Sequence, residues 1–184
     1  MTINRKKFFD GIRQQPFPGK LSQKQVDGVN RLLDEYERRE WNSLYWLAYV
    51  FATTMWETAR TMQPIKEMGS QAYLQSKRYY PWIGRGYVQL TWKYNYAKFH
   101  PEVLELFQVD ILADPDNAMI PEVAAYILFE GMQKGSFTSK KLADYFNART
   151  TDWLNARRII NGTDQAAQIA AIGKQFYADL VAAS

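Results

Sequence analysis

The amino-acid sequence predicts a mainly α-helical protein, folded as a single domain over residues 1–184. Apolar residues recur at helical intervals in most segments, and prolines and glycines separate these segments. Only one short stretch looks extended, so we expect at most a small β-hairpin. The high aromatic content, with 6 Trp, 12 Tyr and 10 Phe, is typical of a chain that buries a sizeable core.

Residues 1–40 predict an N-terminal helical segment that packs on the rest of the domain. A first helix over residues 4–13 ends at the prolines and glycine of residues 16–19. Ser22 and Gln25 have the spacing of a capping box and start a second helix. The charged residues 37–40 then predict a solvated turn.

The central element is a helix over residues 42–60 that is apolar on almost every side. A helix of this kind belongs inside a domain, covered by other helices. Pro64 is predicted to stop it, because a proline disfavours helical conformation in the residue before it. The apolar and uncharged positions of this helix include Trp46, Leu47, Tyr49, Val50, Phe51, Ala52, Thr54, Met55 and Trp56.

Glu57 is the exception in the central helix, because its carboxylate rises among apolar or uncharged neighbours. Desolvation favours the neutral form of a carboxyl group, and a general acid has to be protonated before it reacts. The structural alternative is a buried Glu paired with an Arg. Arg157 and Arg158 are candidates for that pairing, or for contact with an anionic substrate, and we favour the pairing for one of them.

Glu67 is the next carboxylate along the chain and follows Pro64. On one continuous helix the positions from 57 to 67 would span about 15 Å. If the helix is broken at Pro64, the chain can fold back. Glu67 could then face Glu57 across a gap that holds a sugar and a water.

Residues 79–96 combine aromatic rings with amides and hydroxyls. The glycines on both sides of Arg85 predict a tight turn, and the residues after it look extended, so that Gln89 and Thr91 point the same way. Thr91 can cap the next helix and place Asn95 one turn further on that face. This pattern is typical of a carbohydrate groove; the alternative is a polar helix start beside core aromatics.

Three segments together resemble the family 19 glycoside hydrolases, which include plant-type chitinases and bacteriophage or prophage endolysins. They are residues 52–58 (ATTMWET), 84–96 (GRGYVQLTWKYNY) and 159–162 (IING), in the order and approximate separation of that family. The resemblance runs from about residue 44 to the C-terminus. The chain departs from the family at Trp56, where a His is usual, and after Glu57, where a Gly pair is usual.

The resemblance implies a lysozyme-like fold of two helical lobes around a substrate cleft, with inverting hydrolysis of β-1,4 links beside N-acetylglucosamine. It matches Glu57 to the general acid and Thr91 to a hydroxyl that positions the attacking water. Glu67 is our candidate for the general base, and the inverting scheme expects carboxylates about 6.5–9.5 Å apart. By the same resemblance, the substrate-binding residues are Gln89, Tyr94, Asn95 and Asn161.

The remaining segments predict supporting elements. His100 is expected in a surface loop, and residues 114–117 in a turn, because the spacing of a calcium-binding EF-hand is absent. Asp152 is expected to cap one helix, and Thr163 or Asp164 the last one. In chain order the predicted helices are 101–107, 121–131, 139–146, 153–160 and a final helix whose inner stripe contains Ile169, Ile172, Phe176 and Leu180.

The composition excludes several classes of site and argues against some partners. The absence of Cys excludes disulfides, thiolate zinc sites and a Cys nucleophile, and no metal or organic cofactor is implied. Basic residues are scattered among acidic ones, as Lys24, Asp27 and Arg31 show, which argues against a nucleic-acid partner. The basic N-terminus lacks the apolar run of a signal peptide, and no apolar stretch has membrane-spanning length.

We therefore expect a monomeric, endolysin-like glycosidase without stable membrane insertion, whose partner is the glycan strand of peptidoglycan. It would accumulate in a host bacterial cytoplasm until another factor releases it to the cell wall or periplasm. One alternative is a chitinase that acts on chitin or chito-oligosaccharides. The other is a non-catalytic glycan-binding protein.

Overall fold

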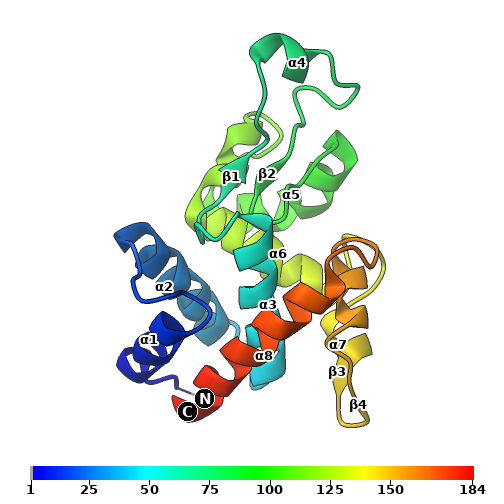
Figure 1. Cartoon of the computed structure of the whole chain (residues 1–184). Coiled ribbons are helices and arrows are strands. Elements are labelled where there is room, and N and C mark those ends of the chain that lie inside the picture. Colours follow the sequence, from blue (N-terminus) through cyan, green and yellow to red (C-terminus); the bar gives the residue numbers. More distant parts are fainter. Residues whose placement is uncertain (1) are drawn as a thin grey trace.

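The computed structural model describes residues 2–184 and consists mostly of helices arranged in two lobes (Figure 1). The elements in order are α1 (Arg5–Gln14), α2 (Gln23–Arg38), α3 (Leu44–Glu57), β1 (Ile65–Lys66), α4 (Gln71–Gln75), β2 (Arg85–Gly86), α5 (Lys93–Phe107), η1 (Pro115–Met119), α6 (Pro121–Lys134), α7 (Leu142–Tyr145), β3 (Phe146–Asn147), β4 (Thr150–Thr151), η2 (Asn155–Ile159) and α8 (Ala166–Ala182). The predicted fold class, mainly α and lysozyme-like, is confirmed.

Two separate hydrophobic clusters account for the two lobes. The lower lobe in Figure 1 is built on α1, α2, α3 and α8, and its cluster includes Phe8, Leu32, Phe51 and Phe176. The upper lobe is built on α5 and η1. Helix α6 joins the lobes because its faces pack into different clusters. Ala125, Leu128 and Phe129 belong to the lower cluster, whereas Val123, Tyr126 and Ile127 belong to the upper one.

Helix α3 is the buried centre that the sequence predicted, with residues 47–55 all buried and α8 packed along it (Figure 1). It ends at Glu57 rather than at Arg60, so the predicted end was wrong. Ala59 and Arg60 adopt left-handed conformations, and the Arg60 N–H donates to the Met55 carbonyl at 2.8 Å. This turn stops the helix before Pro64 is reached. Trp56 was expected among the covered positions, but it is 36% exposed.

The β-structure comprises two short antiparallel pairs among the described residues, where at most one small hairpin was expected. Strands β1 and β2 pair with Ile65 opposite Gly86, and β3 and β4 form a hairpin. The segment up to Thr91 is not extended as predicted. It turns back so that Leu90 bridges Arg85, and Gln89 takes a left-handed φ of 53° at the turn.

Arg85 holds this turn in place from inside the upper lobe. Its side chain is 5% exposed and donates to Asp116 at 2.7 Å, to the carbonyls of Pro81 and Ile83, and to the Tyr96 hydroxyl. A buried guanidinium with this many acceptors is well satisfied. The basic residue between the two glycines is therefore a structural anchor.

Several supporting elements differ from the predicted ones. The helix predicted over 101–107 is the second half of α5, which includes Pro101, and His100 lies in this helix, 3.0 Å from Asp110, instead of in a loop. The helices predicted over 139–146 and 153–160 shorten to α7 and the 3-10 helix η2. The last helix begins after Gln165, without a side-chain cap from Thr163 or Asp164. The capping box of Ser22 and Gln25 is confirmed.

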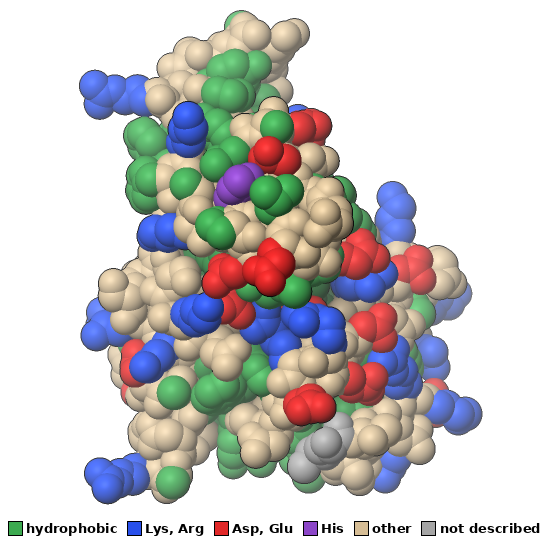
Figure 2. All heavy atoms as spheres, turned by 180° about the vertical axis from the view of Figure 1, so that it is seen from behind, with side chains coloured by type: hydrophobic (Ala, Val, Ile, Leu, Met, Phe, Trp, Pro, Cys, Tyr) green, Lys and Arg blue, Asp and Glu red, His purple; other side chains and the backbone are tan. Residues whose placement is uncertain are grey.

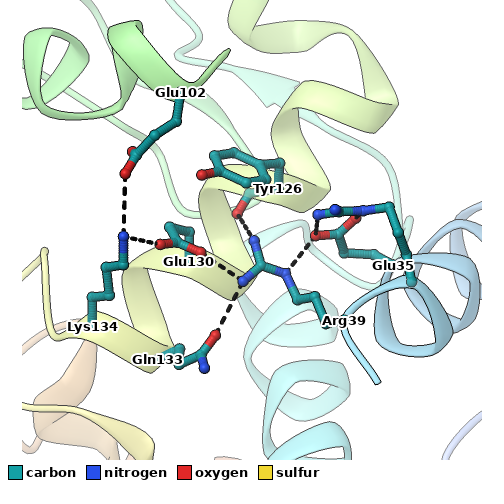
Figure 3. A network of polar contacts seen from close by, with 8 residues as sticks. Glu35, Arg39, Glu102, Tyr126, Glu130, Gln133 and Lys134 are labelled. Carbon is teal, nitrogen blue, oxygen red and sulfur yellow. Dashed lines mark hydrogen bonds and ion pairs between the residues drawn. The ribbon is translucent and has the colours of Figure 1, made fainter. Parts of the chain in front are cut away.

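A buried ion network connects helices of both lobes (Figure 3). Arg39, which follows α2, donates to Glu35 at 2.5 Å and to Glu130 of α6 at 2.6 Å, and its side chain is 8% exposed. Lys134 of α6 pairs with Glu130 and with Glu102 of α5. Burial opposes the charge of Glu130, but hydrogen bonds from Lys134 and Arg39 outweigh it and lower the pKa of this carboxyl group.

Asp179 places a carboxyl group between α1 and α8, directly against Gly11. A Cβ atom at position 11 would lie 2.4 Å from the Asp179 Oδ1, so a larger residue there would force the Asp179 side chain to move. Burial raises the pKa of Asp179 to about 6. An acid with a raised folded-state pKa stabilises the fold when it is protonated, and this contribution is lost as the pH rises from about 4 through about 6.

We expect Asp179→Asn to raise the free energy of unfolding at pH 7 by about 1 kcal/mol, less than the full shift because solvent screens this half-buried group. Urea unfolding at pH 4 and pH 7 measures the effect, which should nearly vanish at pH 4. Asp10→Asn is the control, since the Asp10 carboxylate is paired with Lys6 and Arg13. An equal gain at both pH values would contradict the prediction.

Candidate active site

Glu57 is the last residue of α3, and a buried arginine holds its carboxylate. Arg157 Nη1 lies 2.5 Å from Glu57 Oε1, and the side chains are 5% and 19% exposed, respectively. Arg157 Nε also donates to the Asp164 carbonyl at 3.1 Å. The predicted pairing of one of the two arginines with the central carboxylate is confirmed. Because Glu57 keeps part of its surface, a ligand can reach this carboxylate.

Asn161 is linked through its backbone to Arg157, the residue that holds Glu57. Its backbone N–H donates to the Arg157 carbonyl at 3.1 Å, and its Oδ1 accepts from the Gly162 N–H at 2.8 Å. The side chain is exposed in the loop between η2 and α8. The segment at residues 159–162 therefore comes shortly after Arg157 in the chain, and Arg157 holds the Glu57 carboxylate.

Glu67 directly follows β1 and is fixed through both carboxylate oxygens. Oε1 accepts a hydrogen bond from the Tyr79 hydroxyl at 2.8 Å, and Oε2 accepts from the Gly84 N–H at 3.0 Å. The Glu67 N–H in turn donates to the Gly84 carbonyl at 2.7 Å. The hydrogen bond to Glu67 raises the pKa of Tyr79. A carboxylate held in this way has a defined orientation before any ligand binds.

Gln89, Thr91 and Asn95 form one hydrogen-bonded group beside Glu67. Gln89 Nε2 donates to the Ile65 carbonyl at 2.9 Å, and its Oε1 packs so closely on Gly84 that a Cβ there would lie 2.6 Å away. Thr91 Oγ1 donates to the Gln89 carbonyl, and Asn95 Nδ2 to the Thr91 carbonyl. Thr91 uses its proton internally, so its oxygen is an acceptor toward a ligand or water.

Thr91 does not cap α5, contrary to the prediction. The residue at the cap position is Trp92, which makes no side-chain cap bond and has φ 73° and ψ 134°. A bulky residue with positive φ is costly and is a backbone outlier. Its N–H donates to the Trp82 carbonyl at 2.9 Å, which helps to hold this conformation.

Three neighbouring rings lead toward Glu67 and are called the aromatic strip here: the exposed rings of Trp92 and Tyr94 and the half-buried ring of Tyr79. Trp92 and Tyr94 are 40% and 60% exposed, and their rings stack with centroids 6.2 Å apart. The Tyr79 ring meets Trp92 edge-on at 5.3 Å, and its hydroxyl binds Glu67. The strip therefore leads from open surface to a fixed carboxylate.

The predicted site residues fall into two groups, one on each lobe. Glu57 and Asn161 both contact Arg157 in the lower lobe, whereas Glu67 and its neighbours lie beside the β1–β2 pair of the upper lobe. Residues 58–64 link the two groups. A hollow of about 310 Å³ adjoins the second group beside β1 and α4; its lining includes Lys66, Leu74, Tyr80 and Arg85.

Sequence reasoning missed the contributions of Tyr79 and Trp92. Both were visible as part of an aromatic-rich segment, but their pattern gave no sign that Tyr79 would bind a carboxylate or that Trp92 would take a strained backbone conformation.

The structure also shows, within residues 2–184, no group of His, Cys, Asp and Glu residues arranged to hold a metal ion. No helix in that range is long and apolar enough to cross a membrane.

The two-lobed helical architecture belongs to the lysozyme-like class of folds. Among solved structures, it matches chitinase C from Streptomyces griseus with a TM-score of 0.56 and 17% sequence identity, covering 97% of this chain and 76% of that one. At this identity the match establishes the fold. No protein-family model matches the sequence, and neither does any curated protein.

Proposed function

We propose that this protein is an endolysin-like glycosidase that hydrolyses β-1,4 glycosidic bonds in the glycan strands of bacterial peptidoglycan. The observation that carries the proposal is a pair of carboxylates, one from each lobe, each held by fixed partners. Arg157 holds Glu57, and Tyr79 and Gly84 hold Glu67. The exposed aromatic strip beside Glu67 and the fold shared with a chitinase both support a glycan substrate.

In the proposed inverting mechanism, Glu57 donates its proton to the glycosidic oxygen as the bond to the anomeric carbon breaks. Glu67 takes a proton from a water that attacks the same carbon from the opposite face. The Thr91 oxygen accepts that water's second hydrogen and so orients it. Each hydrolysis transfers one proton from Glu57 to the leaving sugar and one from water to Glu67, and the two carboxyl groups re-equilibrate through solvent.

Substrate binding in this proposal divides between the lobes. Tyr94 and the rest of the aromatic strip support the sugar faces, while Gln89, Asn95 and Asn161 offer amide groups to its hydroxyl and acetamido substituents. The protein is proposed to act as a monomer, after another factor releases it from the host cytoplasm to the cell wall.

The match to a chitinase favours one other function, hydrolysis of chitin or chito-oligosaccharides with the same chemistry. Trp56, which departs from the pattern of family 19, keeps a non-catalytic glycan-binding protein as a further candidate. The endolysin and the chitinase would hydrolyse different polymers, peptidoglycan and chitin respectively. The non-catalytic protein would hydrolyse neither.

Product analysis separates the three functions. We expect purified peptidoglycan to release soluble glycan fragments, identified by mass spectrometry, and outer-membrane-stripped bacteria to clear faster than chitin releases sugars. Proton NMR of the first product should show the α-anomer, because inversion of a β-link gives α. Equal or faster release from chitin would favour the chitinase, and no release from either polymer would leave only glycan binding.

A further inference from the structure

The chain between Glu67 and Glu102 contains no acidic residue, although it contains Lys77, Arg78, Arg85, Lys93 and Lys98. Arg85 is buried and paired with Asp116, so it contributes no free surface charge. The other basic residues belong to the upper lobe, where Figure 2 shows Lys and Arg side chains among exposed hydrophobic ones. The overall charge of +4 is modest, so this segment is locally much more basic than the protein as a whole.

Cations flank the aromatic strip along its length. Lys77 Nζ lies 3.8 Å from the centroid of the Tyr73 ring, and the positive charge of Lys77 acts to lower the pKa of Tyr79, against the raising effect of Glu67. At the other end, Lys98 Nζ lies 5.7 Å from the Tyr94 ring. The basic groups are therefore next to the rings that lead to Glu67.

Lys93 extends this arrangement beside the strained residue Trp92. Its Nζ lies 5.7 Å from the centroid of the Trp82 ring, and the Trp92 N–H donates a hydrogen bond to the Trp82 carbonyl. A strained backbone that persists with an exposed ring is characteristic of ligand-binding positions. Rings contact a sugar whether or not it is charged, whereas exposed ammonium and guanidinium groups favour a ligand that carries negative charge.

We propose that the aromatic strip and its flanking cations form a surface that selects a glycan strand bearing carboxylate groups over an uncharged glycan. This inference rests on the proposed function and specifies the substrate class of the same site. The aromatic rings would support the sugars, and Lys77, Arg78 and Lys93 would meet carboxylates carried on substituents of the strand. The cell-wall glycan, with its peptide substituents, has this chemistry, and chitin does not.

The test measures binding of the Glu57→Gln variant, whose turnover of either polymer should be about 10³- to 10⁴-fold slower, to carboxymethyl chitin and to uncharged glycol chitin. We expect about tenfold tighter binding to the carboxymethyl polymer at low salt, since several exposed contacts each add modestly. The preference should disappear at about 0.5 M salt, where exposed charges are screened.

Charge-matched triple variants locate the effect. Lys77→Gln, Arg78→Gln and Lys93→Gln together should abolish most of the preference for the carboxymethyl polymer without lowering the melting temperature. The control replaces Lys20, Lys24 and Lys174, which lie in the lower lobe, with Gln and removes the same charge. The control should retain the preference.

Three outcomes would overturn the inference alone, and a fourth would also overturn the proposed function. Equal binding to both polymers would show that the surface does not distinguish a charged glycan from an uncharged one. A loss of preference in the control variant would show that the preference depends only on the net charge of the protein. Displacement of the carboxymethyl polymer by polyphosphate at equal charge concentration would show a general polyanion surface. Absence of binding to both polymers would instead refute the proposed function together with the inference.

Discussion

Replacing Glu57 with Gln is expected to lower glycan turnover by about 10³- to 10⁴-fold, the upper part of the range for general acid–base groups. The amide keeps the size of the side chain and can still accept a hydrogen bond from Arg157, but it has no proton to donate to the leaving oxygen. The measurement is the initial rate of release of reducing ends from purified peptidoglycan. Binding of the polymer should change far less than the rate.

Two further variants test the assignment: Glu67→Gln removes the proposed base, and Glu105→Gln is a control. Glu67→Gln should also impair turnover, but less, if the Thr91 oxygen still orients the attacking water. Among the described residues, Glu105 is exposed on α5 and forms no hydrogen bond with Glu57 or Glu67, so Glu105→Gln should act like the unmodified protein. Near-normal turnover of Glu57→Gln would refute its assignment as the acid. A silent Glu67→Gln would leave Glu57 as the acid but require a different base.

The structure also changes the expected stability of Glu57→Gln. A lone buried carboxyl group would destabilise the fold, so its removal would be stabilising. Glu57 is instead the partner of Arg157, whose side chain is 5% exposed. Replacing the carboxyl group with an amide leaves the buried Arg157 guanidinium with a weaker acceptor, and hydrogen bonds to charged groups contribute about 1.5–3 kcal/mol. We therefore expect a melting temperature below that of the unmodified protein.

Arg39→Met is expected to destabilise the protein by about 3–5 kcal/mol, the range found when one partner of a buried ion pair is removed. Arg39 is 8% exposed and neutralises both Glu35 and Glu130, which are themselves 6% and 9% exposed. Methionine fills much of the volume but leaves two buried carboxylates short of a partner. The loss also removes the packing of the guanidinium on the Tyr126 ring, at 5.0 Å from its centroid.

Arg38→Met is a closely matched control, because Arg38 pairs with the same Glu35 but is 48% exposed. An exposed pair contributes about 0–1 kcal/mol, so this variant should unfold close to the unmodified protein. Urea unfolding at pH 7 measures both. The pKa of Glu130 is lowered in the folded state, so the stability that its pairing supplies is present at neutral pH and is lost as the pH falls through that lowered pKa. Equal effects of the two variants would refute a special role for the buried network.

The local sequence pattern was sufficient to predict those elements that are buried along their whole length or that form from neighbouring residues alone. Residues 47–55 are apolar or uncharged on every side, so they had to be buried as a helix wherever the rest of the chain lay. The capping box of Ser22 and Gln25 is formed within four residues and needs no tertiary contact. The same holds for the mainly helical class, which follows from apolar spacing repeated through the chain.

Turns and helix ends were less predictable, because they depend on backbone conformations that a side-chain pattern does not specify. The end of α3 at Glu57 needs left-handed residues at Ala59 and Arg60, neither of which is glycine. The turn after Arg85 needs a left-handed Gln89, in a stretch whose composition suited an extended strand. In both places contacts elsewhere in the fold offset the local preference.

The sequence by itself determined that a single carboxylate would stand in the buried central helix, and that amides and hydroxyls would gather among aromatic rings. Only the tertiary structure decided the partners of these groups. Arg157 reaches Glu57 from 100 positions along the chain, and Tyr79 and Gly84 meet Glu67 from across a bent segment. Such contacts form when distant segments pack, so their geometry depends on the path of the whole chain and not on the spacing of nearby residues.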